Sequence, residues 1–92
     1  MTEHSPTVSI PDDVPTSVVY DMLIETATHL SARYVALSDD AATEDGRRHW
    51  WGKVIDLRDE KEAVDVDDRA TMISKLNAWT ATIRELDEER RG

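Results

Sequence analysis

Large apolar residues recur every three or four positions along two long segments of this chain. The first series consists of Tyr20, Leu23, Ala27, Leu30, Tyr34 and Leu37, and the second of Met72, Leu76, Trp79, Ile83 and Leu86. Such spacing places the side chains on one side of an α-helix. Between the two segments, Trp50, Val54 and Leu57 continue the spacing over a shorter stretch. The sequence therefore predicts an all-α fold, a three-helix antiparallel bundle.

The first helix follows a segment whose composition is typical of a flexible arm. Residues 1–14 contain Pro, Ser, Thr and acidic residues, and their few large apolar residues follow no period. Pro15 suits a first helical turn, and the Ser and Thr that follow it can cap free amide groups. We therefore expect a flexible arm over residues 1–14 and one bundle domain over residues 15–92, with the first helix at about 16–37.

Aspartates mark the beginnings of the other two helices. The second helix is expected at about residues 41–63, after a pair of aspartates that favours a helix start through capping and the macrodipole. Two glycines inside it cost about 1 kcal/mol each relative to alanine, so its first turns are expected to be irregular. The third helix is expected at about residues 67–89, with Asp65 or Asp67 as its capping residue.

The charge of the chain is strongly acidic. Its 20 Asp and Glu against 11 Lys and Arg give a formal net charge of −9. Because proteins draw most of their affinity for nucleic acids from cationic contacts to phosphate, we expect no nucleic-acid partner. A basic partner, or a cleft built for an anionic ligand, suits this charge better. The chain has no Cys, and no run of residues approaches the about 20 apolar residues of a membrane span. We expect a cytoplasmic protein without a membrane partner.

The polar residues form no cluster that could carry out a reaction. Asp45 and His49 lie one helical turn apart, but two ligands without a third make a poor metal site. Glu25 and His29 have the same spacing and are interpreted as an ordinary pair on a helix face. No phosphate-binding Gly-rich loop and no Ser nucleophile motif is found. We therefore expect no enzyme activity, no catalytic residue, no cofactor, no metal and no small-molecule substrate.

Two neighbouring tryptophans and a surplus of apolar residues point to a contact with another protein. Adjacent residues on a helix point about 100° apart, so Trp50 and Trp51 cannot both be fully buried on one side. Since Trp50 fits the spacing of the second helix, we expect Trp51 to be partly exposed, either on a wide apolar face of the middle helix or as an anchor in a partner's pocket. The first helix has further apolar residues away from its main apolar side, namely Val18, Val19, Met22, Ile24 and Val35.

With these features the chain resembles the small antitoxins that are paired with zeta-type toxins, kinases that phosphorylate a nucleotide-sugar precursor of the cell wall. The resemblance covers about residues 16–89 and lies in length, acidity and a three-helix layout. It includes a Trp-rich central helix, followed by Leu57-Arg58-Asp59-Glu60, Val64-Asp65, Asp68-Arg69 and Trp79.

The resemblance implies an antitoxin that binds and neutralises a P-loop toxin kinase, often in a heterotetramer. In that family, a helix of the antitoxin lies over the nucleotide site of the toxin, and the antitoxin does not usually repress its own operon. Here the first helix would take that place, with Asp21 and Glu25 facing the basic groups that otherwise bind phosphates. The expected partner-binding residues are Val18, Asp21, Met22, Glu25 and Trp51.

Two other functions remain open. Trp50-Trp51-Gly52 has the Trp-x-Gly form of small helical substrates of type VII secretion, in which this tripeptide lies in the turn between two long helices. However, the Tyr-containing signal that follows the tripeptide in those proteins is missing, because both Tyr residues of this chain precede the Trp pair. The other alternative is a scaffold or assembly subunit without contact to a toxin.

Overall fold

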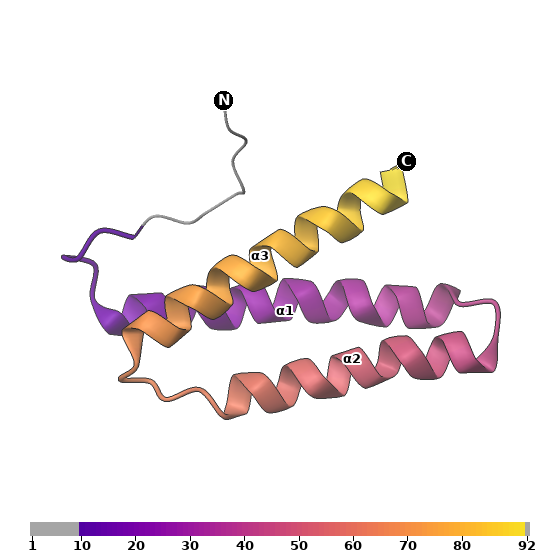
Figure 1. The fold of residues 1–92 in the computed structure, drawn as a ribbon, viewed down its shortest axis with the longest axis horizontal. Coiled ribbons are helices and arrows are strands. Elements are labelled where there is room, and N and C mark those ends of the chain that lie inside the picture. The colour runs from indigo at the N-terminus through magenta and orange to yellow at the C-terminus, as the bar shows by residue number, and fades with distance from the viewer. Residues whose placement is uncertain (1–9, 92) are drawn as a thin grey trace.

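The computed structural model describes residues 10–91, and within that range the chain forms three helices (Figure 1). Helix α1 spans Thr16–Asp40, α2 spans Glu44–Glu62 and α3 spans Arg69–Arg91. The all-α fold predicted from the spacing of apolar residues is confirmed. The predicted helix ends differ from the observed ones by three residues or fewer.

Helix α1 is the central element of the fold. It packs against both α2 and α3, whereas within the described residues no Cα atom of α2 lies within 8 Å of one in α3. Figure 1 shows α2 running back alongside α1, while α3 crosses α1 at an angle and leads away from α2. Side chains still connect α2 and α3, since Lys75 Nζ lies 3.4 Å from Glu60 Oε1. One face of the α1–α2 pair is therefore partly covered by α3, and the other is not.

The core lies along α1, where the three helices meet. The buried apolar residues are Val19, Leu23, Ala27 and Leu30 of α1, Leu57 of α2, and Met72, Leu76, Trp79 and Leu86 of α3. Most of them belong to the series of apolar residues in the sequence. Val19 is an exception. It lies outside the main series and is counted among the apolar residues available for a contact with another protein, yet its side chain is 0% exposed. Helix α2 contributes one buried residue because its backbone lies close to that of α1 but not to that of α3.

Helix α2 begins at a threonine. Thr43 Oγ1 accepts a hydrogen bond of 2.9 Å from the backbone N–H of Gly46, and the aspartates expected to start this helix form the last turn of α1 instead. The glycines do not interrupt α2, which is helical from its first residue and continues through Gly52. The irregular first turns predicted from glycine content are therefore absent.

Helix α3 begins at Arg69 and is capped by Asp68, one residue after the later of the two expected capping residues. Asp68 accepts hydrogen bonds from the backbone N–H and the hydroxyl of Thr71, at 3.1 and 2.8 Å. Both bonds hold the pKa of Asp68 below its ordinary value, and the bond from the hydroxyl has the larger effect. The capping role predicted for Asp65 or Asp67 is wrong, because Asp65 Oδ1 accepts from the N–H of Asp67 within the preceding turn.

The end of the predicted N-terminal arm is attached to the bundle. Ile10 and Val14 pack against the core. The guanidinium of Arg69 donates to the carbonyl oxygen of Pro11 at 2.9 Å and to that of Val14 at 2.6 Å. The rest of the predicted arm, residues 1–9, lies outside the described residues.

An ion pair between α1 and α3 leads to a prediction about acid stability. Arg33 Nε and Nη2 donate to the two carboxylate oxygens of Asp87, each at 3.1 Å, and these bonds hold the pKa of Asp87 below its ordinary value. A carboxylate with a depressed pKa in the folded state contributes stability above its unfolded pKa of about 3.9, and loses it as the pH falls through the folded value. We therefore expect Asp87→Asn to lose less stability than the wild type on acidification.

The measurement is urea unfolding at neutral pH and at about pH 3. Glu88→Gln is the control, because Glu88 is the neighbouring exposed carboxylate. Equal acid sensitivity of the wild type and Asp87→Asn would show that this pair contributes nothing to acid stability.

Candidate protein-binding surfaces

Three large apolar side chains of the described residues are exposed. Val18 is 41% exposed, Trp51 50% and Val66 51%. Trp50 is half-buried, with its ring stacked on Tyr34 at a centroid distance of 6.0 Å. The two tryptophans thus differ as their positions on the helix predict. Val66 is a residue that the spacing could not identify, because it lies in the turn between α2 and α3, where no helical period applies.

The predicted binding residues of α1 form an exposed face on its first turns, with one exception. Val18, Asp21 and Glu25 are exposed and lie three or four residues apart, so they share one side of the helix. Glu25 pairs with His29 at 3.8 Å, and both side chains are mostly exposed. Met22 is only partly exposed, since it packs against the core. Its side chain therefore serves the bundle as well as this face, which we call the α1 acidic face (Val18, Asp21, Glu25).

Trp51 lies away from the α1 acidic face. The N-terminal half of α2 packs beside the C-terminal half of α1, as the Tyr34–Trp50 contact and a 3.0 Å hydrogen bond from the Ser38 hydroxyl to the carbonyl of Arg47 show. The α1 acidic face is on the first turns of α1, at the other end of this helix pair. The predicted set therefore falls into two separate places.

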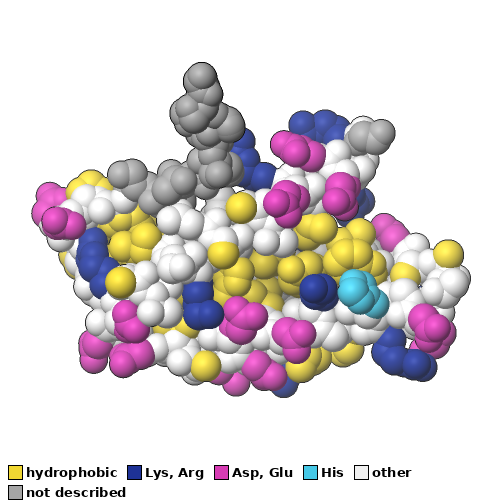
Figure 2. Space-filling model, viewed as in Figure 1, with side chains coloured by type: hydrophobic (Ala, Val, Ile, Leu, Met, Phe, Trp, Pro, Cys, Tyr) yellow, Lys and Arg dark blue, Asp and Glu magenta, His cyan; other side chains and the backbone are white. Residues whose placement is uncertain are grey.

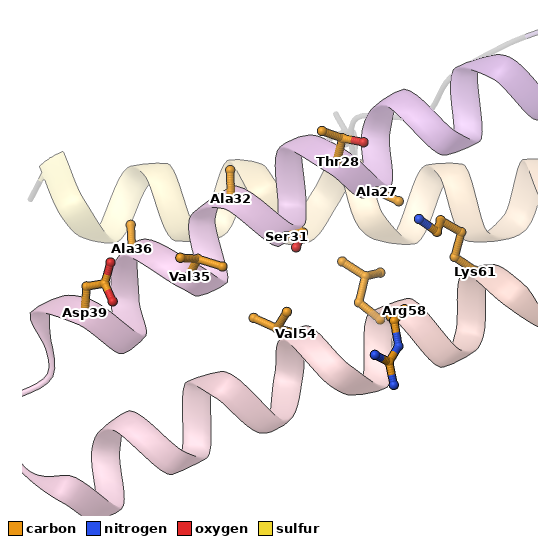
Figure 3. A pocket seen from close by; sticks show the side chains of 11 residues that line it. Ala27, Thr28, Ser31, Ala32, Val35, Ala36, Asp39, Val54, Arg58 and Lys61 are labelled. Atoms are coloured by element: carbon orange, nitrogen blue, oxygen red, sulfur yellow. The ribbon is translucent and has the colours of Figure 1, made fainter.

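A groove of about 600 Å³ runs between α1 and α2 on the side away from α3 (Figure 3). It is lined mainly by small and apolar side chains, with charged ones at its ends: Ala27, Thr28, Ser31, Ala32, Val35, Ala36, Asp39, Val54, Leu57, Arg58 and Lys61. In Figure 3, α3 passes behind α1. Ser31, Val35 and Val54 lie in the space between the two nearer helices, whereas Thr28, Ala32 and Ala36 lie on the side of α1 away from α2. The spacing of apolar residues in the sequence does not predict this groove. Its only signal is the succession of small residues in the second half of α1.

The opposite face of the α1–α2 pair has a much smaller hollow. Its volume is about 130 Å³, and Tyr34, Leu57, Glu60 and Trp79 are among the residues that line it. Burial, and secondarily the charge of Glu60, raise the pKa of Tyr34, so its hydroxyl stays protonated at neutral pH. Figure 2 shows this face, with apolar side chains visible between α2 and the diverging α3 and acidic side chains around them.

Asp45 and His49, the pair considered as metal ligands, each contact a nearby side chain of α2. Asp45 lies 3.7 Å from Arg48 of the same helix, and the ring of His49 contacts the edge of Trp50 at a centroid distance of 4.8 Å. Within residues 10–91, no three His, Asp or Glu side chains come together in a way that could hold a metal ion. In the same range, no helix is sufficiently long and apolar to cross a membrane.

Comparisons of the chain with protein-family models, with characterised proteins and with solved structures find no match. The antitoxin role therefore stays a prediction from the sequence.

Proposed function

We propose that this chain is a non-enzymatic antitoxin that binds and neutralises a toxin kinase by covering its nucleotide and substrate site. The observation that carries the proposal is the α1 acidic face, where an exposed Val18 lies beside the carboxylates of Asp21 and Glu25. No other described part of the chain neutralises these carboxylates beyond the exposed contact of Glu25 with His29. The face therefore offers apolar contact and negative charge together.

The chemistry of this face fits the site that it would cover. A kinase that binds a nucleotide needs Lys or Arg side chains around the phosphates, and these are the groups that pair with carboxylates. The net charge of −9 adds a long-range attraction to such a basic site and raises the association rate. An antitoxin bound in this way inhibits by occlusion and needs no catalytic group of its own.

Trp51 is a second contact in this proposal. Tryptophan is among the residue types most enriched at the energetic centres of protein interfaces, and half of this side chain is exposed in the free protein. Because Trp51 lies far along the helix pair from the α1 acidic face, a partner that uses both must extend along the bundle. The proposed partner is a P-loop kinase in the cytoplasm, in an assembly such as a heterotetramer.

The alternative of a type VII secretion substrate has less support. In that class of protein the Trp-x-Gly tripeptide lies in a turn between two helices. Here Gly52 lies inside α2, and the two connections between helices are at residues 41–43 and at residues 63–68. A scaffold subunit has no specific observation in its favour.

The test is the affinity for the product of the neighbouring gene, which the proposal expects to be a P-loop kinase, measured by isothermal titration calorimetry. We expect the double variant Asp21→Lys with Glu25→Lys to bind several-fold more weakly than the wild type, since it reverses two charges that face basic groups. The matched control is Glu85→Lys with Glu89→Lys, which reverses two exposed charges at the same spacing on α3. Unchanged affinity of the α1 variant, or equal weakening by both variants, would remove the α1 acidic face from the interface.

A further inference from the structure

The groove between α1 and α2 is the larger of the two hollows described above and has a distinctive distribution of charge. Its middle is apolar, with Val35 of α1 facing Val54 of α2, and small side chains surround them. Small side chains allow a further helix to approach closely, because the distance between packed helices depends on the side chains at the contact. Leu57 at its floor is buried, so the groove is an outer layer of the core that no described element covers.

The two ends of the groove carry opposite charges. Asp39 lies at one end, near the C-terminus of α1, and Arg58 and Lys61 lie at the other, near the C-terminus of α2 (Figure 3). Arg58 has an exposed contact of 3.6 Å with its neighbour Asp59, whereas within residues 10–91 neither Asp39 nor Lys61 takes part in an ion pair. The charged side chains at both ends are therefore free to pair with an occupant of the groove.

We propose that this groove is the interface of a symmetric homodimer, in which the α1–α2 face of one copy packs on the same face of a second copy. In a two-fold dimer, the same patch meets itself, so the patch must be complementary to itself. A two-fold axis across the middle of the groove reverses the direction of the second copy. Asp39 of each copy then lies at the same end of the interface as Arg58 and Lys61 of the other, and the apolar middles face each other.

The charges also select between the two possible orientations of such a dimer. If the axis ran along the groove, the second copy would keep its direction, and the two Asp39 carboxylates would share one end while four cations shared the other. Like charges placed together oppose association, whereas the reversed orientation creates two attractive ends. The dimer is therefore a four-helix arrangement in which α1 faces α1 and α2 faces α2, each pair antiparallel, with α3 of each copy on the outside.

The experiment measures the mass of the full chain by sedimentation velocity over a range of micromolar concentrations. The chain mass is 10.4 kDa, so the wild type is expected to reach twice this mass. We expect Asp39→Lys, and separately Lys61→Asp, to raise the dimer dissociation constant at least about tenfold, because each places like charges together at both ends. Combining the two substitutions restores opposite charges and should return the constant to within about threefold of the wild type.

Controls with the same charge change lie away from the groove. Glu85→Lys on α3 matches Asp39→Lys, and Lys53→Asp on the opposite face of α2 matches Lys61→Asp. Circular dichroism of each variant verifies that the helices remain. A wild-type chain that stays at 10.4 kDa, or a double variant that does not regain the dimer, would overturn the proposal. Self-association is measured without a toxin, so its outcome is separate from that of the proposed function.

Discussion

Replacing Trp79 by alanine is expected to lower the free energy of unfolding by about 3 to 5 kcal/mol, as for other buried aromatic side chains. Trp79 is 7% exposed, and it lines the same hollow as Leu30 of α1 and Leu57 of α2. Its indole therefore lies between α1 and α2 in the region where the backbones of α2 and α3 are not in contact. Alanine would leave a cavity at the point where side chains of all three helices meet.

The matched control is Trp51→Ala, which removes the same side chain from an exposed position. Trp51 is 50% exposed, and a surface substitution of this kind changes stability by about 0.5 kcal/mol or less. Urea unfolding followed by circular dichroism compares the two variants at neutral pH. Similar losses of stability would contradict the assignment of Trp79 to the core and Trp51 to the surface.

Replacing Leu23 by alanine should have the second largest effect, a loss of about 2 to 5 kcal/mol. Leu23 is 0% exposed and lies at the middle of the buried series of α1, between Val19 and Ala27. Since α1 is the only helix that packs against both others, a cavity at this position weakens the whole bundle. A domain of this size has a free energy of unfolding of only a few kcal/mol to spare.

Val18→Ala is the control for this second prediction, because it also removes an apolar side chain from the first turns of α1. Val18 is 41% exposed, so its truncation is expected to change stability by about 0.5 kcal/mol or less. Thermal and urea unfolding of both variants give the comparison. A loss for Val18→Ala as large as that for Leu23→Ala would mean that α1 packs with a different face inward.

The fold could be predicted from the sequence because long helices that are apolar on one side leave a period of three to four residues. The series around Leu23 and Leu76 identified α1 and α3, and most of its members are buried. The start of α3 does not follow from this period, since several aspartates near residue 66 have similar capping ability. Asp68 was selected by its hydrogen bonds with Thr71, which depend on where the helix actually begins.

The arrangement of the helices could not be predicted in the same way. Both faces of α1 have apolar residues, so the spacing does not decide which face α3 covers. Helix α3 packs on the side of Arg33, where the bidentate pair with Asp87 joins the two helices across 54 residues of sequence. The opposite side, around Val35, becomes the open groove. Such long-range choices depend on packing that no local pattern in the sequence contains.

The candidate binding residues were predicted in part. The exposure of Trp51 follows from its position beside Trp50 on one helix, and Val18, Asp21 and Glu25 are exposed as a binding role requires. Whether these residues meet in one patch is a question of tertiary structure.

The central claim is that the acidic and apolar surface of this bundle exists to cover a partner, and a growth assay tests it most directly. The product of the neighbouring gene, which the proposal expects to be a P-loop kinase, is expressed alone, with the wild-type chain, and with the Asp21→Lys, Glu25→Lys double variant, all at equal protein levels. The proposed function predicts arrested growth with the kinase alone, full growth with the wild type and poor growth with the double variant. Growth arrest that the wild-type chain does not relieve, or a neighbouring gene that encodes no such kinase, would contradict it.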